Sequence, residues 1–289
     1  MIAEQPMIGI IGGSGLYEIE GVRTTDEREV DTPFGSPSSP ITFGEVDGRP
    51  VAFLARHGLG HVFNPSEVNY RANIFALKKV GVKRVISVSA CGSLREDFKP
   101  GEIVVPDQLY DNTRGRRQTF FEGGLVAHVD VASPFCTDLS AHLADSVDAV
   151  GGVAHRGGGY ITVEGPRFST RAESHTYRSW GMSIVGMTTC PEAFLAREAE
   201  LCYSVLAHVT DYDVWRTTEE PVTAEMVFRV LKANTELAKM ALLDLIRTLP
   251  SERPCDCGHA LKSALTTGPS AIDPQARERL ALLVDPYLS

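Results

Sequence analysis

Long apolar runs are missing from this sequence of 289 residues. No segment approaches the roughly 20 consecutive apolar residues that a helix needs to cross a bilayer, so we expect no membrane-spanning helix. The N-terminal MIAEQPMIGIIGG lacks the basic segment followed by an apolar one that marks a signal peptide. We therefore expect a cytoplasmic protein.

Positive charge is also scarce. The formal net charge of -9 argues against nucleic acid or an anionic membrane as a partner, although a locally basic pocket can still bind an anionic small molecule. A polar loop that we expect to be solvated holds three arginines: Arg114, Arg116 and Arg117. The length suits one large α/β domain or two small ones, and a hydrophobic content of 43% suffices for a buried core.

Nucleotide-cofactor motifs are absent as well. The glycine-rich residues 12–15 (GGSG) follow an apolar run, but their spacing is not GxGxxG, and no Gly-Lys-Ser/Thr follows as in a P-loop. Glycines at a strand end still let backbone N–H groups approach an anion, and Ser14 adds a hydroxyl donor. This is a weak signal for phosphate, and a plain turn is an equally good interpretation.

The sequence also lacks the CxxC pairs of zinc ribbons and thioredoxins. Four of its six cysteines stand singly, at positions 91, 136, 190 and 202, where a free cysteine behaves as a small core residue. Cys255 and Cys257 lie close together, with His259 nearby. These three ligands are an incomplete metal site without a second cluster. A reversible disulfide is a further alternative, and we favour an exposed pair without a role.

What the sequence does contain is an alternation of strand and helix patterns. The apolar runs predict strands at residues 7–13, 41–46, 51–55, 82–89, 101–109, 160–163 and 183–187, and from Val205 onward. The Asp47-Gly48 turn predicts that the second and third of these strands form a hairpin. The helical patterns predict helices at residues 69–80, 138–150, 171–180, 192–200, 223–249, 259–265 and 274–283. We expect one α/β domain over residues 1–250. Residues 251–289 should form a helical extension that packs on the same domain and whose last residues can be mobile.

Polar residues suited to an anion follow several of these strands. Ligands of open α/β sheets bind beyond the carboxyl ends of the strands. Arg56 and His57 follow one strand and together can hold a phosphate, although an exposed surface pair is the plainer interpretation. Residues 90–93 are expected to form a loop of small residues, which lets a ligand approach the backbone. Thr188 precedes a predicted helix, where the N-terminus suits an anion.

Two acids end the apolar run VLAHV. Asp211 and Asp213 face the same side if the strand continues, because side chains alternate along a strand. Taken alone, they are more typical of a polar turn. Phe168 and Ser169 precede a helix with a predicted Thr170–Glu173 capping box, and the aromatic ring can stack on a planar ligand. The combined set indicates transfer to or from phosphate on a substrate with a hydrogen-bonding head group.

With these residues in this order, the sequence resembles the 5′-methylthioadenosine phosphorylases of the trimeric purine nucleoside phosphorylase family. The matching stretches include IGIIGGSGLY, LARHG, SACGSLRED, EGPRFSTRAES, WGMSIVGMTTCPEAFLAREAELCY and TDYDVW. They cover most of residues 8–249 in the family's order and spacing. The resemblance implies a mixed, twisted central sheet flanked by helices. It also implies a homotrimer or hexamer, phosphate as co-substrate, and neither a metal nor an organic cofactor.

The resemblance also implies roles for individual residues. The phosphate-binding positions are Ser14, Arg56, His57, Ser89, Ala90 and Thr188. The remaining substrate-binding positions are Cys91, Gly92, Phe168, Ser169, Val185, Met187, Asp211, Asp213, Ala224, Val227 and, from a neighbouring subunit, His128. The 5′-methylthio pocket falls at Ala224 and Val227, and Ala224 stands where some members carry a larger aliphatic residue.

The implied reaction is phosphorolysis of 5′-methylthioadenosine to adenine and 5-methylthioribose 1-phosphate. We expect Asp211 to protonate N7 of the leaving purine, Asp213 to hold the 6-amino group, and His57 to hold the phosphate. The main alternative is a phosphorylase of 6-oxopurine nucleosides or 5′-methylthioinosine. Family members of that kind typically carry Glu and Asn where this chain has Ser169 and Asp211, so we favour 6-aminopurines.

Overall fold

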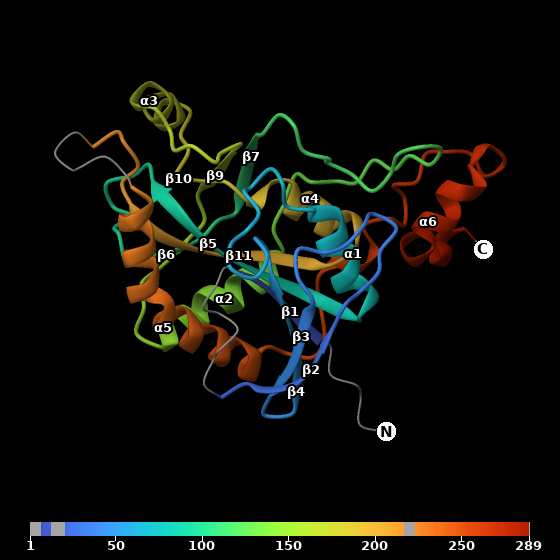
Figure 1. The fold of residues 1–289 in the computed structure, drawn as a ribbon, viewed down its shortest axis with the longest axis horizontal. Coiled ribbons are helices and arrows are strands. Elements are labelled where there is room, and N and C mark those ends of the chain that lie inside the picture. Colours follow the sequence, from blue (N-terminus) through green and yellow to red (C-terminus); the bar gives the residue numbers. More distant parts are fainter. Residues whose placement is uncertain (1–6, 13–20, 217–222, 289) are drawn as a thin grey trace.

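The structure is a computed structural model that describes residues 7–12, 21–216 and 223–288, without the side chains of residues 226–229 and 231–234. Over these residues the strands form one eleven-stranded mixed sheet (Figure 1). The strands are β1 (Met7–Gly12), β2 (Arg23–Arg28), β3 (Ile41–Val46), β4 (Arg49–Ala55), β5 (Val82–Ser93), β6 (Ile103–Val105), β7 (Gln108–Asn112), β8 (Ala154–Arg156), β9 (Gly159–Val163), β10 (Ile184–Gly186) and β11 (Cys202–Asp211). The predicted α/β domain with a mixed central sheet is confirmed.

The sheet is organised around β5 and β11. Its main path runs β2-β3-β4-β1-β5-β10-β9-β7, while β11 pairs with β5 and β6, and β6 pairs with β8. β11 is parallel to β5 and buried along its whole length. A strand covered on both faces reads as a continuous apolar run, which is why the sequence signal at β11 is strong.

Helices cover both faces of the sheet (Figure 1). They are α1 (Tyr70–Lys79), α2 (Thr137–Ala149), α3 (Arg171–Ser179), α4 (Thr189–Glu198), α5 (Ala224–Thr248) and α6 (Pro274–Val284). One apolar cluster joins α1, α4 and α6 to one face. A second joins α2 and α5 to the other. Along β11, Val205 and Ala207 belong to the first cluster and Leu206 to the second, as the alternation of strand side chains requires.

Several local predictions are confirmed. β3 and β4 form the predicted antiparallel hairpin, and Thr170 and Glu173 form both hydrogen bonds of a capping box. The final helix α6 also lies where the pattern placed it. Its buried residues Leu280 and Leu283 share the apolar cluster of α1 and α4, so this part of the C-terminal extension packs on the same core.

Other predictions were wrong in their boundaries. The strand expected at residues 101–109 is interrupted between β6 and β7, where Pro106 lacks the N–H that a sheet ladder needs. Residues 90–93 continue β5 instead of forming a loop, because they pair with β10 and β11. The helix expected at residues 259–265 is replaced by a 3-10 turn, Asp256–His259. The exposed strand β2 was not predicted, because RTTDER carries no apolar alternation.

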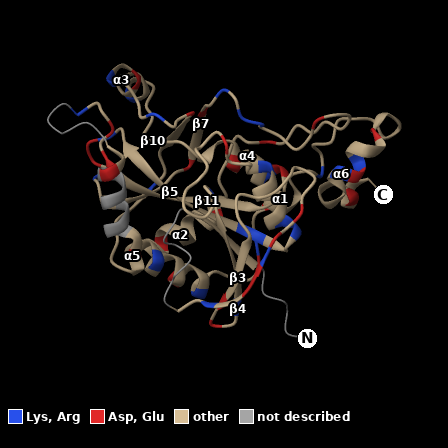
Figure 2. Cartoon of the chain, in the orientation of Figure 1, with Lys and Arg blue, Asp and Glu red and all other residues tan. Residues whose placement is uncertain are grey.

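The surface carries charges of both signs along helices and loops, which Figure 2 shows interspersed in this view. Among the described helices, none combines the length and the apolarity required to cross a bilayer.

Candidate active site

The two acids lie where β11 ends against β5. Asp211 is paired with Gly92, and the register shifts between Val209 and Asp211. Such a bulge redirects the side chains that follow it. Asp213 then adopts a left-handed backbone conformation, with φ of 51°, and its N–H donates to Asp211 Oδ1 at 2.7 Å. The polar turn and the carboxylate pair are therefore one feature, because the turn brings Asp213 back to Asp211.

Gly92 provides the space that this pair occupies. A Cβ atom at Gly92 would lie 3.0 Å from Asp211 Oδ1, 3.2 Å from Asp213 Cβ and 3.2 Å from Val185 Cγ1. A larger residue on β5 would therefore push against both acids and against β10. The structure brings Gly92, Val185, Asp211 and Asp213 together. Gly92, whose small size was expected to leave space for a ligand, also leaves space for the two acids.

The two carboxyl groups have different surroundings although both are buried. Asp211 accepts hydrogen bonds at both oxygens, from the Thr210 hydroxyl at 2.7 Å and from the Asp213 N–H. Asp213 Oδ2 has no hydrogen-bond partner among the described residues. Burial raises the pKa of Asp213, and the hydroxyls of Ser174 and Ser169 lower it only in part. The carboxyl group of Asp213 is therefore one that favours a proton, and Ser169 lies beside it.

Arg56, at the end of β4, is held by a buried partner that sequence reasoning missed. Its guanidinium donates to both oxygens of Glu192 at 2.8 and 3.1 Å, and to the Ser87 hydroxyl at 2.6 Å. Arg56 is 2% exposed and Glu192 is fully buried. Burial lowers the pKa of Arg56, but the charge and hydrogen bonds of Glu192 outweigh it, so the pKa is raised. Most hydrogen-bond donors of the Arg56 guanidinium are therefore used by partners within the protein.

His57 is a neutral ring with a fixed tautomer. Its Nδ1 lies 2.9 Å from the carbonyl oxygen of Phe63. A carbonyl only accepts, so Nδ1 carries the hydrogen, and Nε2 of the neutral ring carries the lone pair. Burial and the charge of Arg56 lower the pKa of His57 to about 4, although the Phe63 carbonyl raises it. The ring also stacks on His61, with centroids 4.3 Å apart.

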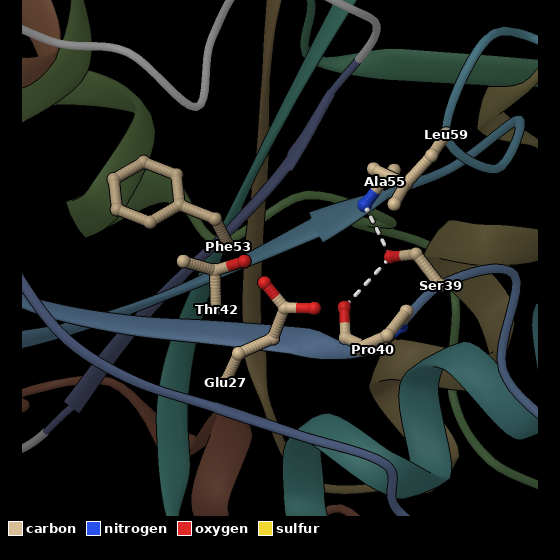
Figure 3. Close-up of a pocket in the computed structure, with 7 residues that line it drawn as sticks. All are labelled: Glu27, Ser39, Pro40, Thr42, Phe53, Ala55 and Leu59. Carbon is tan, nitrogen blue, oxygen red and sulfur yellow. Dashed lines mark hydrogen bonds between the residues drawn. The ribbon is translucent and has the colours of Figure 1, made fainter.

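The end of β4 is braced by the preceding loop. The Ser39 hydroxyl accepts from the Ala55 N–H at 3.0 Å and donates to the Pro40 carbonyl at 2.8 Å (Figure 3). This fixes the backbone directly before Arg56 and His57. The pocket beside Ser39 does not include the predicted site residues. It is lined by Glu27, Ser39, Pro40, Thr42, Phe53, Ala55 and Leu59.

Buried hydroxyls lie close to the same strand ends. Ser89 is 9% exposed and Thr188 is 6% exposed. The Ser89 hydroxyl, like those of Tyr160 and Thr189, has no hydrogen-bond partner within the described part of the chain. Thr188 stands at the N-cap of α4 but makes no side-chain capping bond. Buried hydroxyls without partners are costly, so these groups are suited to a ligand with acceptor oxygens.

The position of Arg116 contradicts the expectation that all arginines of this loop are solvated. It is buried and donates to the carbonyl oxygens of Met187 at 2.7 Å, Cys190 at 2.6 Å and Glu164 at 2.8 Å. These bonds hold the segment between β10 and α4, which carries Met187 and Thr188. Arg114 and Arg117 are exposed. The RGRR run gave no signal that would separate one buried arginine from its neighbours.

The remaining predicted residues are distributed as follows. Ala90 and Met187 are half-buried, Cys91 is buried, and Phe168 is exposed on the loop before α3. Ala224 is the exposed first residue of α5. The exposed His128 donates its N–H to the carbonyl of Ala264 in the C-terminal extension. Two further predicted positions, Ser14 and the side chain of Val227, lie outside the described residues.

The cysteines also differ from the expectation. Cys257 is buried and Cys255 is half-buried, so the favoured interpretation of an exposed pair was wrong. Within the described chain, one group of side chains has metal-ligating chemistry, and it consists of Cys136, Cys202, Cys255 and Cys257. Cys202 begins β11, whereas Asp211 ends it, so this group lies at the other end of the strand from the acids.

Known proteins match this sequence over most of its length. A family model described as phosphorylase superfamily matches residues 7–247. The S-methyl-5′-thioadenosine phosphorylase of Geobacter sulfurreducens is 50% identical over 98% of this chain and 100% of its own length. That of Hyperthermus butylicus is 54% identical over 89% of this chain and 95% of its own.

Solved structures agree with this match. A methylthioadenosine phosphorylase from an antarctic soil metagenomic library has a TM-score of 0.92 and 44% identity, over 97% of this chain and 99% of its own. The methylthioadenosine phosphorylase from Schistosoma mansoni in complex with adenine has a TM-score of 0.82 and 34% identity, over 96% and 98%. The chain therefore belongs to the S-methyl-5′-thioadenosine phosphorylases of the phosphorylase superfamily.

Proposed function

We propose that the strand-end site performs the reaction for which the family is named. A phosphate oxygen attacks C1′ of S-methyl-5′-thioadenosine as the bond from C1′ to the purine breaks, giving adenine and 5-methylthioribose 1-phosphate. Relatives with this name match nearly the full chain. The structural observation that carries the proposal is the buried pair of Asp211 and Asp213 beside Gly92.

The carboxyl pair supplies the proton that the departing purine needs. Without a proton at N7, the purine must leave as an anion. Both acids are buried and linked through the Asp213 N–H, so we treat them as a coupled pair that carries one proton at the catalytic step. Asp211 delivers the proton to N7, and Asp213 accepts a hydrogen bond from the 6-amino group. The raised pKa of Asp213 supports the presence of a proton in this pair.

Phosphate binds through neutral donors more than through a free cation. The hydroxyls of Ser89 and Thr188 and the backbone at Ala90 donate to its oxygens, while Arg56 adds positive potential from its ion pair with Glu192. Neutral His57 presents the Nε2 lone pair, so it accepts a hydrogen bond from the P–OH group that a phosphate dianion still carries. This fixes the nucleophile in one orientation, which lowers the entropic part of the barrier. Ser14 adds a further hydroxyl donor.

The base pocket selects a 6-aminopurine. Asp213 accepts from the 6-amino group, and Ser169 replaces the glutamate that would accept from the N1–H of a 6-oxopurine. A site with such hydrogen bonds rejects the wrong partner by up to about 10⁴–10⁵, since its polar groups are otherwise left unpaired. Phe168 and Met187 pack on the base and ribose, and Ala224 with Val227 holds the methylthio group.

A second copy of the chain completes the site in a homotrimer or a hexamer in the cytoplasm. His128 is exposed and held against the C-terminal extension by its backbone, which supports a role towards a neighbouring subunit.

The test is a phosphate-dependent assay of methylthioadenosine, adenosine, methylthioinosine and inosine in parallel. We expect kcat/KM for methylthioadenosine to exceed that for methylthioinosine by at least about 10²-fold, because a 6-oxo group leaves the acids unpaired. A preference for the 6-oxo substrates would assign the chain to the alternative activity. Binding without turnover of any substrate would identify a nucleoside sensor.

A further inference from the structure

Four cysteines from three distant segments meet on the side of the sheet covered by α2 and α5. Cys136 is the N-cap of α2, and Cys202 is the first residue of β11. Cys255 and Cys257 follow α5. All four Sγ atoms lie within 4.8 Å of one another. The sequence shows only the last pair as a cluster, because the other two cysteines are separated from it and from each other by more than fifty positions.

The spacing of these sulfur atoms suits a shared metal ion. The Sγ atoms of Cys202 and Cys255 are 3.4 Å apart, and a disulfide requires about 2.05 Å. A tetrahedral zinc site with Zn–S bonds of about 2.3 Å places its sulfurs about 3.8 Å apart. The four cysteines are free thiols in this structure. Four mutually close thiols are the ligand set of a structural zinc ion.

Positive groups and N–H donors surround the sulfurs. Arg197 donates to Cys257 Sγ at 3.5 Å, and Arg253 lies 3.9 Å from Cys202 Sγ. Four thiolates around a divalent cation carry a net charge of about -2, which such arginines offset. The Leu139 N–H donates to Cys136 Sγ at 3.5 Å, a contact that favours a thiolate.

The buried β5 residue opposite Cys202 adds a further cation. Arg84 is paired with Cys202 in the β5–β11 register and is 1% exposed. Its Nε has no partner among the described residues.

We propose that Cys136, Cys202, Cys255 and Cys257 bind one Zn²⁺ ion in a tetrahedral structural site. Binding converts the four thiols to thiolates and releases their protons to solvent, without oxidation of sulfur. All four coordination positions belong to the protein, so no position is open for water or substrate. The ion joins α2, β11 and the segment after α5, and thereby anchors the C-terminal extension to the central sheet.

The site is remote from the proposed catalytic acids. β11 separates Cys202 from Asp211 by nine residue steps, which is about 30 Å for an extended strand. Loss of the metal should therefore lower thermal stability while phosphorolysis at 25 °C persists in the folded fraction. This proposal departs from the expectation of a chain without a metal, because that expectation considered only Cys255 and Cys257 as a close pair of thiols.

The first experiment measures metal in the wild-type chain. The full-length protein is produced with added zinc, purified under reducing conditions without chelator, and analysed by mass spectrometry of the elements and by zinc X-ray absorption. We expect one zinc per chain with four sulfur neighbours at about 2.3 Å. Metal-free protein overturns the proposal, whether thiol alkylation then finds these four cysteines as free thiols or as two disulfides.

The second experiment uses matched variants. Cys255→Ser with Cys257→Ser should abolish zinc retention, whereas Cys190→Ser, which changes a buried cysteine elsewhere, should retain one zinc per chain. Equal zinc content in both variants overturns the proposal. Should the double variant fail to fold, mercurial titration of the wild type replaces it. One zinc released as four thiols react supports the site, and release independent of thiol modification refutes it.

Discussion

At the residue scale, a single turn brings together the two acids of the proposed site. The sequence allowed a polar turn or a carboxylate pair at the end of β11, and the structure contains both, because the Asp213 N–H bonds to Asp211. The period-two argument from the sequence missed the register shift before Asp211. Bulges depend on the partner strand, so one strand's own pattern does not reveal them.

Gly92→Ala tests whether the space beside the acids matters. The new methyl group would lie 3.0 Å from Asp211 Oδ1, so the acids must move. A displacement of about 1 Å can cost about 10²-fold in rate, and we expect kcat/KM to fall by that order. Gly268→Ala is the matched control, because a Cβ there meets no atom within 4 Å. Equal activity of both variants would show that the acids tolerate the displacement.

At the element scale, the site is held by contacts between strand ends and the segments that follow them. The hairpin of β3 and β4 and the capping box of α3 are local patterns, and the sequence predicted both. The ion pair of Arg56 with Glu192 and the bonds of Arg116 join residues more than forty positions apart. Such pairings carry no local periodicity, so sequence reasoning could not distinguish these charged residues from solvated ones.

Glu192→Gln tests the contact that joins β4 to α4. Removing one partner of a buried ion pair leaves a charge uncompensated and costs about 3–5 kcal/mol, so the melting temperature should fall clearly. Asp97→Asn is the control, because the exposed pair with Arg95 is worth at most about 1 kcal/mol. Phosphate should raise the melting temperature of the Glu192 variant more than that of the wild type, since the anion replaces the missing charge. If phosphate raises the melting temperature of both proteins equally, Arg56 does not lie beside the bound anion.

At the scale of the whole molecule, burial of titratable groups couples stability to pH. His208 on β11 is 1% exposed, and burial lowers its pKa from 6.5 to about 4. The unfolded chain therefore takes up this proton first as the pH falls. The contribution of His208 is fully present above pH 6.5 and is lost between pH 6.5 and 4. At pH 5 the loss relative to pH 8 is about 2 kcal/mol.

His208→Gln should remove this part of the pH dependence. We expect the wild type to lose on the order of 5 °C more in melting temperature than the variant between pH 8 and pH 5, at equal protein concentration. Buried Glu198, whose pKa is raised to about 7 by burial, acts in the opposite direction but is common to both proteins. Parallel melting curves for the two proteins would argue against a buried neutral histidine.

The C-terminal extension shows what the sequence could and could not predict about the whole molecule. The pattern placed α6 correctly from its apolar spacing. The four cysteines come together only through the long-range packing of α2, β11 and the segment after α5, so the CxC pair seemed isolated. The phosphate and base positions were found through resemblance, because each strand-end residue alone is also typical of an ordinary surface or turn.

The proposed mechanism depends on protonation of the departing adenine by the buried acid pair. Its most direct test is Asp211→Asn, with kcat for methylthioadenosine phosphorolysis and the dissociation constant of methylthioadenosine measured on the same preparation. Loss of a general acid predicts a kcat lower by about 10²–10⁴-fold, with the nucleoside still bound within about tenfold of the wild-type affinity. Unchanged turnover would contradict the claim.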